Sequence, residues 1–226
     1  MSNFFTSSIG KKFFMSITGV FLILFLLVHL TINSFLLFGD GELFNRAATF
    51  MGTNPIMKII EPILALGFVL HIFFAGFITL KNQFARPIKY KTIDRKESAS
   101  LASRNMFVLG ALILVFLCIH LTNFFWKMKF GTIDTILYDG VEFHNAYALV
   151  SGLFINYLWY DILYVIGAIL LGFHLSHGFW SAFQTIGFNN DIWIKRLKII
   201  ANIFAVIIGG GFAIIPIYFY VVYNLL

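Results

Sequence analysis

Five long stretches of this 226-residue chain consist almost entirely of apolar residues, and shorter polar segments separate them. A helix needs roughly 20 mainly apolar residues to cross a hydrocarbon core about 30 Å thick, and each stretch reaches that length. The pattern therefore predicts five transmembrane helices, which we number by their order in the chain. Their expected ranges are Phe14–Phe38, Glu61–Leu80, Asn105–Trp126, Tyr157–Phe183 and Ile199–Tyr223.

Proline, glycine and the outer polar segment refine this expectation. Pro62 is expected in the first turn of the second helix, where a missing N–H costs nothing. The glycines at 209–211, together with Pro216, are expected to bend the fifth helix or to let it pack closely. The apolar segment from Ala146 onward is expected to lie along the membrane interface before the fourth helix begins.

The composition agrees with a membrane protein and excludes most soluble classes. Hydrophobic residues make up 60% of the chain and charged residues 12%, which is too little polar surface to cover a water-soluble globule. We therefore predict a single all-α integral membrane domain over residues 1–226. Cys118 is the one cysteine of the sequence, which excludes an internal disulfide framework and a Cys-rich zinc or iron–sulfur site.

The basic residues gather in alternate polar segments, and this asymmetry indicates the orientation. Twelve of the 16 Lys and Arg residues lie before the first helix, between the second and third, and between the fourth and fifth. Seven of the ten acidic residues lie on the other side. The positive-inside rule then places the N-terminus and the segment 81–104 in the cytoplasm, with the C-terminus outside. The net charge of +6 therefore reports topology, and no nucleic-acid partner is expected.

Histidines occur inside four successive predicted helices. His29, His71, His120 and His174 lie in the first to fourth helix respectively, and His177 follows one turn after His174. An ionisable residue inside a membrane span is rare, and it marks a functional site by default. A single such histidine could simply make an interhelical hydrogen bond, but four on successive helices indicate a common role.

The depth of these histidines groups them into two pairs. At 1.5 Å per residue, His29 and His120 lie about 22 Å from the cytoplasmic helix ends, whereas His71 and His174 lie about 14–15 Å from them. Two histidines at one depth are what bis-imidazole ligation of a haem iron requires, and a neutral imidazole binds iron without burying a charge. We therefore expect an outer haem held by His29 and His120 and an inner haem held by His71 and His174.

Small residues near these histidines could leave room for a flat porphyrin. Gly67, Gly167 and Gly178 fall near the histidine-bearing faces of the second and fourth helices. The alternative interpretation is that these glycines only help the helices to pack.

Two haems at two depths indicate electron transfer across part of the membrane, between a redox subunit on one face and a lipid-soluble quinone. The chain has no G-x-G-x-x-G fingerprint and no cysteine set, so any flavin or iron–sulfur chemistry must belong to a separate chain. The candidate quinone-binding residues around the outer pair are Asn33, Arg46, Asn123 and Trp126. Each of them could equally be a capping or interfacial residue.

Several motifs resemble those of a known family, and the resemblance covers nearly the whole chain. They are Val28-His29-Leu30 followed by Asn33, the stretch Phe44-Asn45-Arg46-Ala47-Ala48, Glu61 ten residues before His71, and the run from His174 to Ser181, HLSHGFWS. The chain resembles the single-subunit, five-helix, dihaem cytochrome b membrane anchors of succinate dehydrogenases and fumarate reductases. One departure is the long outer segment 127–160.

The resemblance implies two non-covalently bound haems b and ligation by His174 rather than His177. It also implies an FAD-containing flavoprotein and an iron–sulfur subunit as cytoplasmic partners, menaquinone as the quinone, and a location in the bacterial cytoplasmic membrane. Such a subunit transfers electrons but does not itself dehydrogenate succinate. Two alternatives remain: the cytochrome b subunit of a hydrogenase or formate dehydrogenase, and a proton-coupled transporter that uses histidines as relays.

Overall fold

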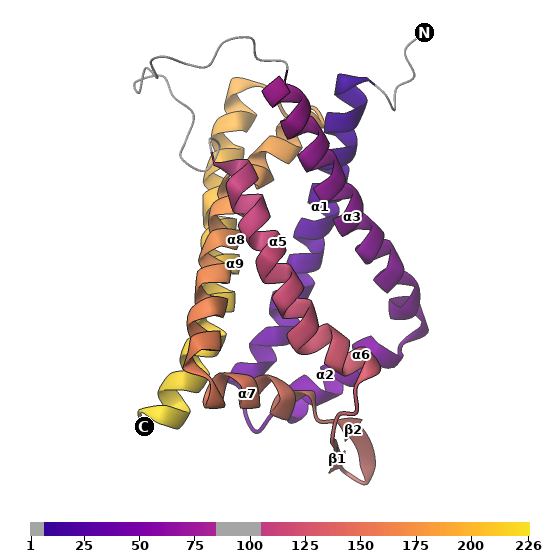
Figure 1. The fold of residues 1–226 in the computed structure, drawn as a ribbon, viewed down its shortest axis with the longest axis vertical. Helices are drawn as coiled ribbons and strands as arrows, with labels where there is room; N and C mark the ends of the chain where they lie inside the picture. Colours follow the sequence, from indigo (N-terminus) through magenta and orange to yellow (C-terminus); the bar gives the residue numbers. More distant parts are fainter. Residues whose placement is uncertain (1–6, 85–104) are drawn as a thin grey trace.

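Five long apolar helices form the body of the protein (Figure 1). The computed structural model describes residues 7–84 and 105–226. The five helices are long and apolar enough to cross a membrane, as the sequence predicted, and they form a multi-pass helical bundle. Four of them are α1 (Ser8–Ser34), α3 (Pro55–Phe84), α8 (Leu158–Thr185) and α9 (Asp191–Asn224), and the other is the span Met106–Phe130, which begins with α5 (Met106–His120).

Two of these helices continue through a different helical geometry. α1 runs on into the 3-10 turn η2 (Phe35–Leu37). α5 continues through the π-helical turn η3 (Leu121–Phe125) into α6 (Trp126–Phe130), so that one long element reaches from residue 106 to residue 130.

α1 and α9 begin earlier than the apolar stretches, and polar side chains cap their first turns. The Ser7 hydroxyl accepts a hydrogen bond from the Gly10 N–H (3.0 Å), and Asn190 Oδ1 accepts one from the Trp193 N–H (2.9 Å). Such caps satisfy backbone donors that a new helix leaves free. Since α3 begins at Pro55, Pro62 lies inside the helix, and the prediction that it occupies the first turn was wrong.

A small cap of secondary structure covers the end of the bundle where the C-terminus lies (Figure 1). It consists of α2 (Glu42–Thr53), the hairpin of β1 (Thr135–Tyr138) and β2 (Val141–His144), and α7 (Ala146–Asn156). The sequence predicted α7 as a segment lying along the interface, but it did not predict α2 or the hairpin. The hairpin turns at Asp139 and Gly140, both with positive φ, which is the signature of a tight Asp-Gly turn.

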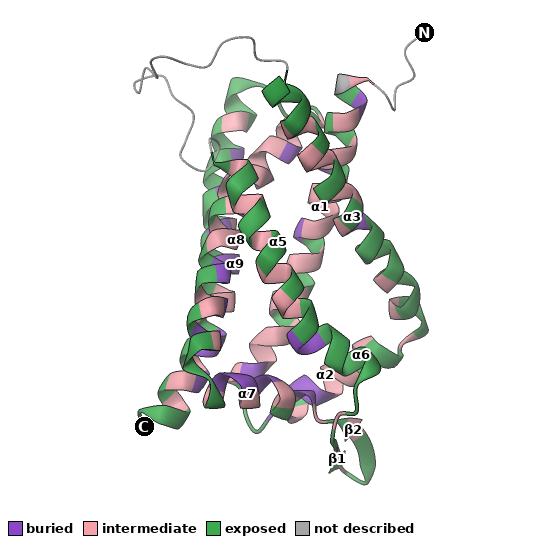
Figure 2. Ribbon diagram, viewed as in Figure 1, coloured by how far each residue is buried: buried purple, intermediate pink, exposed green. Residues whose placement is uncertain are grey.

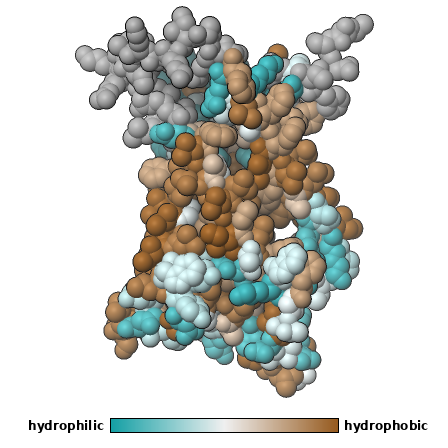
Figure 3. Space-filling view, viewed as in Figure 1, coloured by the Kyte–Doolittle hydropathy of each residue, from teal (hydrophilic) through white to brown (hydrophobic). Residues whose placement is uncertain are grey.

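The ends of the bundle differ in charge in the way the sequence indicated. Figure 1 places the start of α1, the end of α3, the start of α5 and the α8–α9 turn together, away from the C-terminus. Lys11, Lys12, Lys81 and the basic residues at the start of α9 lie on these segments. Between the two ends, apolar side chains cover the bundle (Figure 3). The basic residues of 86–104 lie outside the described residues.

α8 and α9 form the most closely packed part of the bundle, whereas α3 and α5 are largely exposed (Figure 2). A Cβ on Gly209 would lie 3.1 Å from the carbonyl oxygen of Ala168 and 3.3 Å from Cα of Gly172. The two backbones are therefore in contact, as is common where small residues face each other in membranes. This confirms the predicted close packing of the fifth helix, and α9 stays continuous through Pro216.

Asn45 joins three elements of the small cap, which we call the outer cap after the side on which the charge pattern of the sequence places it. Its fully buried side chain donates from Nδ2 to the Tyr138 hydroxyl (3.0 Å) and to Asn145 Oδ1 (3.3 Å), and its Oδ1 accepts from the Tyr147 N–H (2.7 Å). Asn145 Oδ1 also accepts from the Ala148 N–H (3.1 Å), which caps α7. The position of α7 against α2 and β1 therefore depends on one buried amide.

The first prediction concerns the α8–α9 contact. Gly209→Leu should destabilise the protein by about 1–3 kcal/mol, because a side chain there must push two backbones apart. Gly210→Leu is the matched control, since a Cβ on Gly210 meets nothing within 4 Å. The measurement is the thermal unfolding midpoint of each purified variant in the same detergent. Equal midpoints for the two variants would contradict the contact.

The second prediction concerns the outer cap. Asn45→Ala leaves the half-buried Tyr147 N–H and Tyr138 hydroxyl without this partner, which should cost about 1–3 kcal/mol. Asn156→Ala is the control, because Asn156 is exposed and bonds the Gly152 carbonyl of its own helix. Limited proteolysis should cut the Asn45 variant faster in the hairpin. Identical cutting of both variants would count against the role of Asn45.

Candidate functional site

Four histidines from four helices meet as two pairs inside the bundle. The rings of His29 on α1 and His120 at the end of α5 lie 5.7 Å apart, centroid to centroid, and are perpendicular. The rings of His71 on α3 and His174 on α8 lie 6.5 Å apart at 72°. The structure thus brings together the same two pairs that the depth estimate grouped.

The two pairs lie at different levels along α1. The inner pair lies beside Thr18, whose hydroxyl oxygen is 3.4 Å from Nδ1 of His71, and the outer pair includes His29 itself. Eleven residues of helix separate these positions, which corresponds to about 16 Å along the helix axis. A single helix therefore contributes to both levels.

Aromatic side chains surround the outer pair. Phe25 and Phe212 lie 5.1 and 5.5 Å from the His29 ring, centroid to centroid. Phe116, Phe124 and Tyr164 surround the His120 ring at 5.5–6.0 Å. These rings come from α1, α5, η3, α8 and α9, and they keep water and competing polar groups away from the imidazoles.

Small residues border the inner pair, but they are not all the predicted ones. A Cβ on Gly19 would lie 3.5 Å from Cε1 of His71, and a Cβ on Gly110 would lie 3.8 Å from Cε1 of His174. Neither glycine could be predicted from the sequence, since periodicity relates a glycine to its own helix and not to a histidine on another. Gly178 lies near His174, as expected, with its Cβ position 4.0 Å from Cδ2.

Gly67 and Gly167 contact phenylalanine rings. Their Cβ positions would lie 2.9 Å from the ring of Phe21 and 2.5 Å from the ring of Phe116. The expectation that they leave room for a porphyrin was therefore wrong, and the packing interpretation describes them. The reason is physical: a bulky ring on the neighbouring helix fills the space that each glycine leaves.

The imidazole nitrogens of the two pairs are poorly satisfied. Nδ1 of His120 and Nδ1 of His174 are buried and have no hydrogen-bond partner among the described residues. Buried polar atoms nearly always have a partner, so an orphaned one in a native protein points to a missing ligand or water. On His29, the amide Nδ2 of Asn33 lies 3.4 Å from Nδ1.

The two imidazoles of each pair suit a metal ion whose other ligands come from a cofactor. Within residues 7–84 and 105–226, no group of three or more His, Cys, Asp and Glu could hold a metal ion by itself. Each pair offers two imidazoles. A haem iron takes its other four ligands from the porphyrin, so two facing imidazoles are sufficient for it.

The other two histidines have different surroundings. The His177 ring lies 4.9 Å from the Trp180 ring, edge to face, and it pairs with no other histidine ring in the described structure. His144 is exposed on β2, in the outer hairpin. Neither residue therefore joins the two pairs, although Nδ1 of His177, like Nδ1 of His120 and of His174, is buried without a hydrogen-bond partner among the described residues.

The four candidate quinone residues do not converge on one site. Asn33 donates to the carbonyl of His29 (2.8 Å), and buried Asn123 donates to the Tyr164 hydroxyl (3.2 Å), so both lie beside the outer pair. Trp126 is largely exposed, and its ring lies 4.7 Å from that of Phe130.

Arg46, the fourth candidate, lies in the outer cap. It forms ion pairs with Glu42 (2.6 Å) and Asp139 (2.8 Å). The hydrogen bond to Glu42 is the main reason that the pKa of the Arg46 guanidinium is raised above its usual value. The charge of Arg46 is therefore already matched by two carboxylates of the cap.

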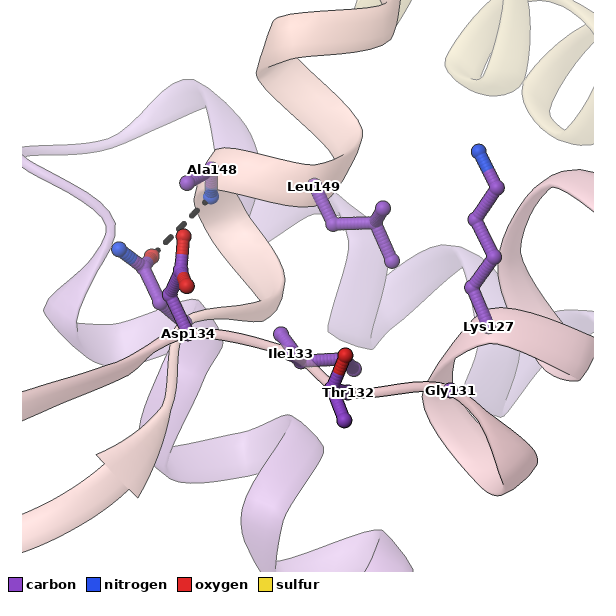
Figure 4. A pocket seen from close by; sticks show the side chains of 8 residues that line it. Lys127, Gly131, Thr132, Ile133, Asp134, Ala148 and Leu149 are labelled. Carbon is purple, nitrogen blue, oxygen red and sulfur yellow. Dashed lines mark hydrogen bonds between the residues drawn. The ribbon is translucent and has the colours of Figure 1, made fainter.

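A cavity of about 440 Å³ opens at the outer end of the bundle (Figure 4). Lys127, one of its lining residues, lies two helical turns beyond His120. This separation is about 10 Å along the helix axis. Figure 4 shows Lys127 and Leu149 on either side of this space. The lining residues are Lys127, Gly131, Thr132, Ile133, Asp134, Asn145, Ala148 and Leu149.

Comparison with known proteins gives no family for this chain: no family model, curated protein or solved structure matches it. The indications of function therefore come from the histidine pairs and their surroundings.

Proposed function

We propose that this chain is the dihaem cytochrome b membrane subunit of a succinate:quinone oxidoreductase. In this proposal His29 and His120 ligate the outer haem, and His71 and His174 ligate the inner haem. The observation that carries it is the meeting of four intramembrane histidines as two close pairs. The family-like motifs around His29, Arg46 and His174 favour this enzyme over other cytochrome b proteins.

When bound, two haems b supply one-electron carriers at two depths in the membrane. The residues of the chain orient the imidazoles, exclude water and tune the potential through the groups next to each ligand. Around the outer pair, the rings of Phe25, Phe116 and Phe124 provide the apolar surroundings. Around the inner pair, Gly19 and Gly110 leave the imidazoles free of side-chain contact on one side.

The proposed partners follow from what the chain lacks and from its charge. With one cysteine, this sequence cannot hold an iron–sulfur cluster of its own. A flavoprotein with FAD and an iron–sulfur subunit would supply or accept the electrons at the basic end of the bundle. That end faces the cytoplasm of a bacterial cell if the positive-inside rule applies.

The proposed quinone, menaquinone by family resemblance, would react at the outer end. The half-open cavity there supports this. Its lining combines apolar side chains, Ile133 and Leu149, with hydrogen-bond donors, Lys127 and Thr132, that could meet a quinone carbonyl.

The decisive measurement is a reduced-minus-oxidised visible spectrum of the purified protein, with haem counted per chain. We expect about two low-spin haems b per chain and co-purification of a flavoprotein and an iron–sulfur protein. Co-purification of a hydrogenase or formate dehydrogenase instead would select that alternative. A folded protein that neither contains nor binds haem would exclude every cytochrome function and favour the proton-coupled transporter.

Single substitutions assign the ligands. His174→Ala should remove the inner haem and leave about one haem per chain. His177→Ala, one turn away, should leave about two, because its ring contacts Trp180 and no other histidine ring in the described structure. Haem content by pyridine haemochrome is the readout. Retention of both haems in the His174 variant would overturn the assignment.

A further inference from the structure

The hydroxyl of Thr18 faces the imidazole of His71 across the α1–α3 interface. Its Oγ1 lies 3.4 Å from Nδ1 of His71, although 53 residues separate the two in sequence. The same Oγ1 lies 2.9 Å from the Phe14 carbonyl oxygen and 3.0 Å from the Met15 carbonyl oxygen, both on its own helix. Three potential partners therefore surround one hydroxyl.

The single proton of this hydroxyl decides the direction of the contact. The carbonyl oxygens of Phe14 and Met15, at 2.9 and 3.0 Å, are nearer to Oγ1 than Nδ1 of His71 is, at 3.4 Å, so the single hydroxyl proton is assigned to one of these carbonyls. With this assignment the hydroxyl presents a lone pair towards His71, and Nδ1 of His71 is the donor. A neutral imidazole with its proton on Nδ1 has its free lone pair on Nε2.

The neighbouring residue gives the ring space to take this position. Gly19 lies directly against His71, and a Cβ there would be 3.5 Å from Cε1 and 3.7 Å from Nδ1. A larger side chain would displace the imidazole from the Thr18 hydroxyl. Two successive residues of α1 thus accommodate the His71 ring: Thr18 offers a hydrogen-bond acceptor, and Gly19 leaves space for the ring.

None of the other three paired histidines has such an acceptor among the described residues. Nδ1 of His120 and Nδ1 of His174 have no partner, and His29 faces the amide Nδ2 of Asn33. That Nδ2 donates to the His29 carbonyl and has no lone pair to offer. The inner pair is therefore asymmetric, with one oriented and one unoriented imidazole.

We propose that Thr18 is the positioning residue of the inner pair, accepting a hydrogen bond from Nδ1 of His71 so that Nε2 is free to bind haem iron. This inference rests on the proposed function. A hydrogen bond donated by Nδ1, the nitrogen that does not bind iron, makes the ligating Nε2 more basic and fixes the plane of the ring. A more basic ligand stabilises the ferric form, so Thr18 lowers the reduction potential of the inner haem.

The test uses three substitutions in the whole chain with its co-purifying partners. Thr18→Val keeps the shape but removes the acceptor, and Thr18→Ser restores it. Thr31→Val is the matched control, because Thr31 is on the same helix and also bonds a carbonyl of its own helix, that of Leu27, but is exposed. The readouts are a redox titration that resolves the two haems and the rate at which each haem transfers to apomyoglobin.

We expect Thr18→Val to raise the potential of the inner haem only, and to weaken its binding about 10- to 100-fold. Thr18→Ser and Thr31→Val should match the wild type. The proposal is overturned if Thr18→Val matches the wild type, if Thr18→Ser behaves like Thr18→Val, or if Thr31→Val produces the same shift. A wild-type protein without haem would instead count against the proposed function.

A second measurement does not require haem. In haem-free protein labelled with ¹⁵N in its histidines, the His71 signals can be assigned by their loss in His71→Gln. Their chemical shifts should report a neutral ring protonated at Nδ1, and Thr18→Val should abolish that preference. A His71 ring protonated at Nε2 in the wild type would overturn the proposal regardless of the haem content.

Discussion

A membrane interior offers no water to a polar group, and this constraint decides where the chemistry of the protein lies. Backbone groups are satisfied within helices, and the polar side chains inside the spans must find partners within the protein. Asn123 does so with Tyr164, and Thr18 does so with carbonyls of its own helix. Among the described residues, the buried polar side-chain atoms without a partner include Nδ1 of His120 and Nδ1 of His174, together with Nδ1 of His177, both carboxylate oxygens of Asp161 and the hydroxyl of Thr49. In the membrane interior, paired imidazoles that lack hydrogen-bond partners favour the binding of a further group over a purely structural role.

The scaffold separates packing from ligand binding. α8 and α9 are held by direct backbone contact at Gly172 and Gly209, and they form a firm support on one side of the bundle. α3 and α5, by contrast, bury few of their side chains against other helices (Figure 2). Each histidine pair joins one helix of the pair α1 and α8 to one of these loosely packed helices. A group bound between paired histidines would therefore also hold the bundle together, which is how cofactor binding and stability become linked.

The outer cap and the π-helical turn shape the end where a quinone would react. In η3, directly after His120, the widened turn buries Asn123 and Phe124 against the aromatic cluster around the outer pair. Single π-turns are often found at functional sites. The amide of Asn45 fixes α7 against α2 and β1, and Asn145 and Leu149 bordering the cavity belong to that cap. The outer pair and the cavity are thus connected through one continuous stretch of helix.

The sequence by itself determined the five spans, the alternation of charge between the two ends and the grouping of the histidines by depth. These features depend on apolar length, on the positions of Lys and Arg, and on the fixed rise of a helix, all of which are local. Helix ends such as Ser7 and Asn190 lay beyond the apolar stretches, so hydropathy missed them. Three features were decided only by the tertiary structure. Gly67 and Gly167 pack against phenylalanine rings, and Gly19 and Gly110 border the inner pair. The Thr18 hydroxyl contacts the His71 ring. Those contacts join residues on different helices, and their formation depends on helix rotation and side-chain volume, which no periodicity along one helix contains.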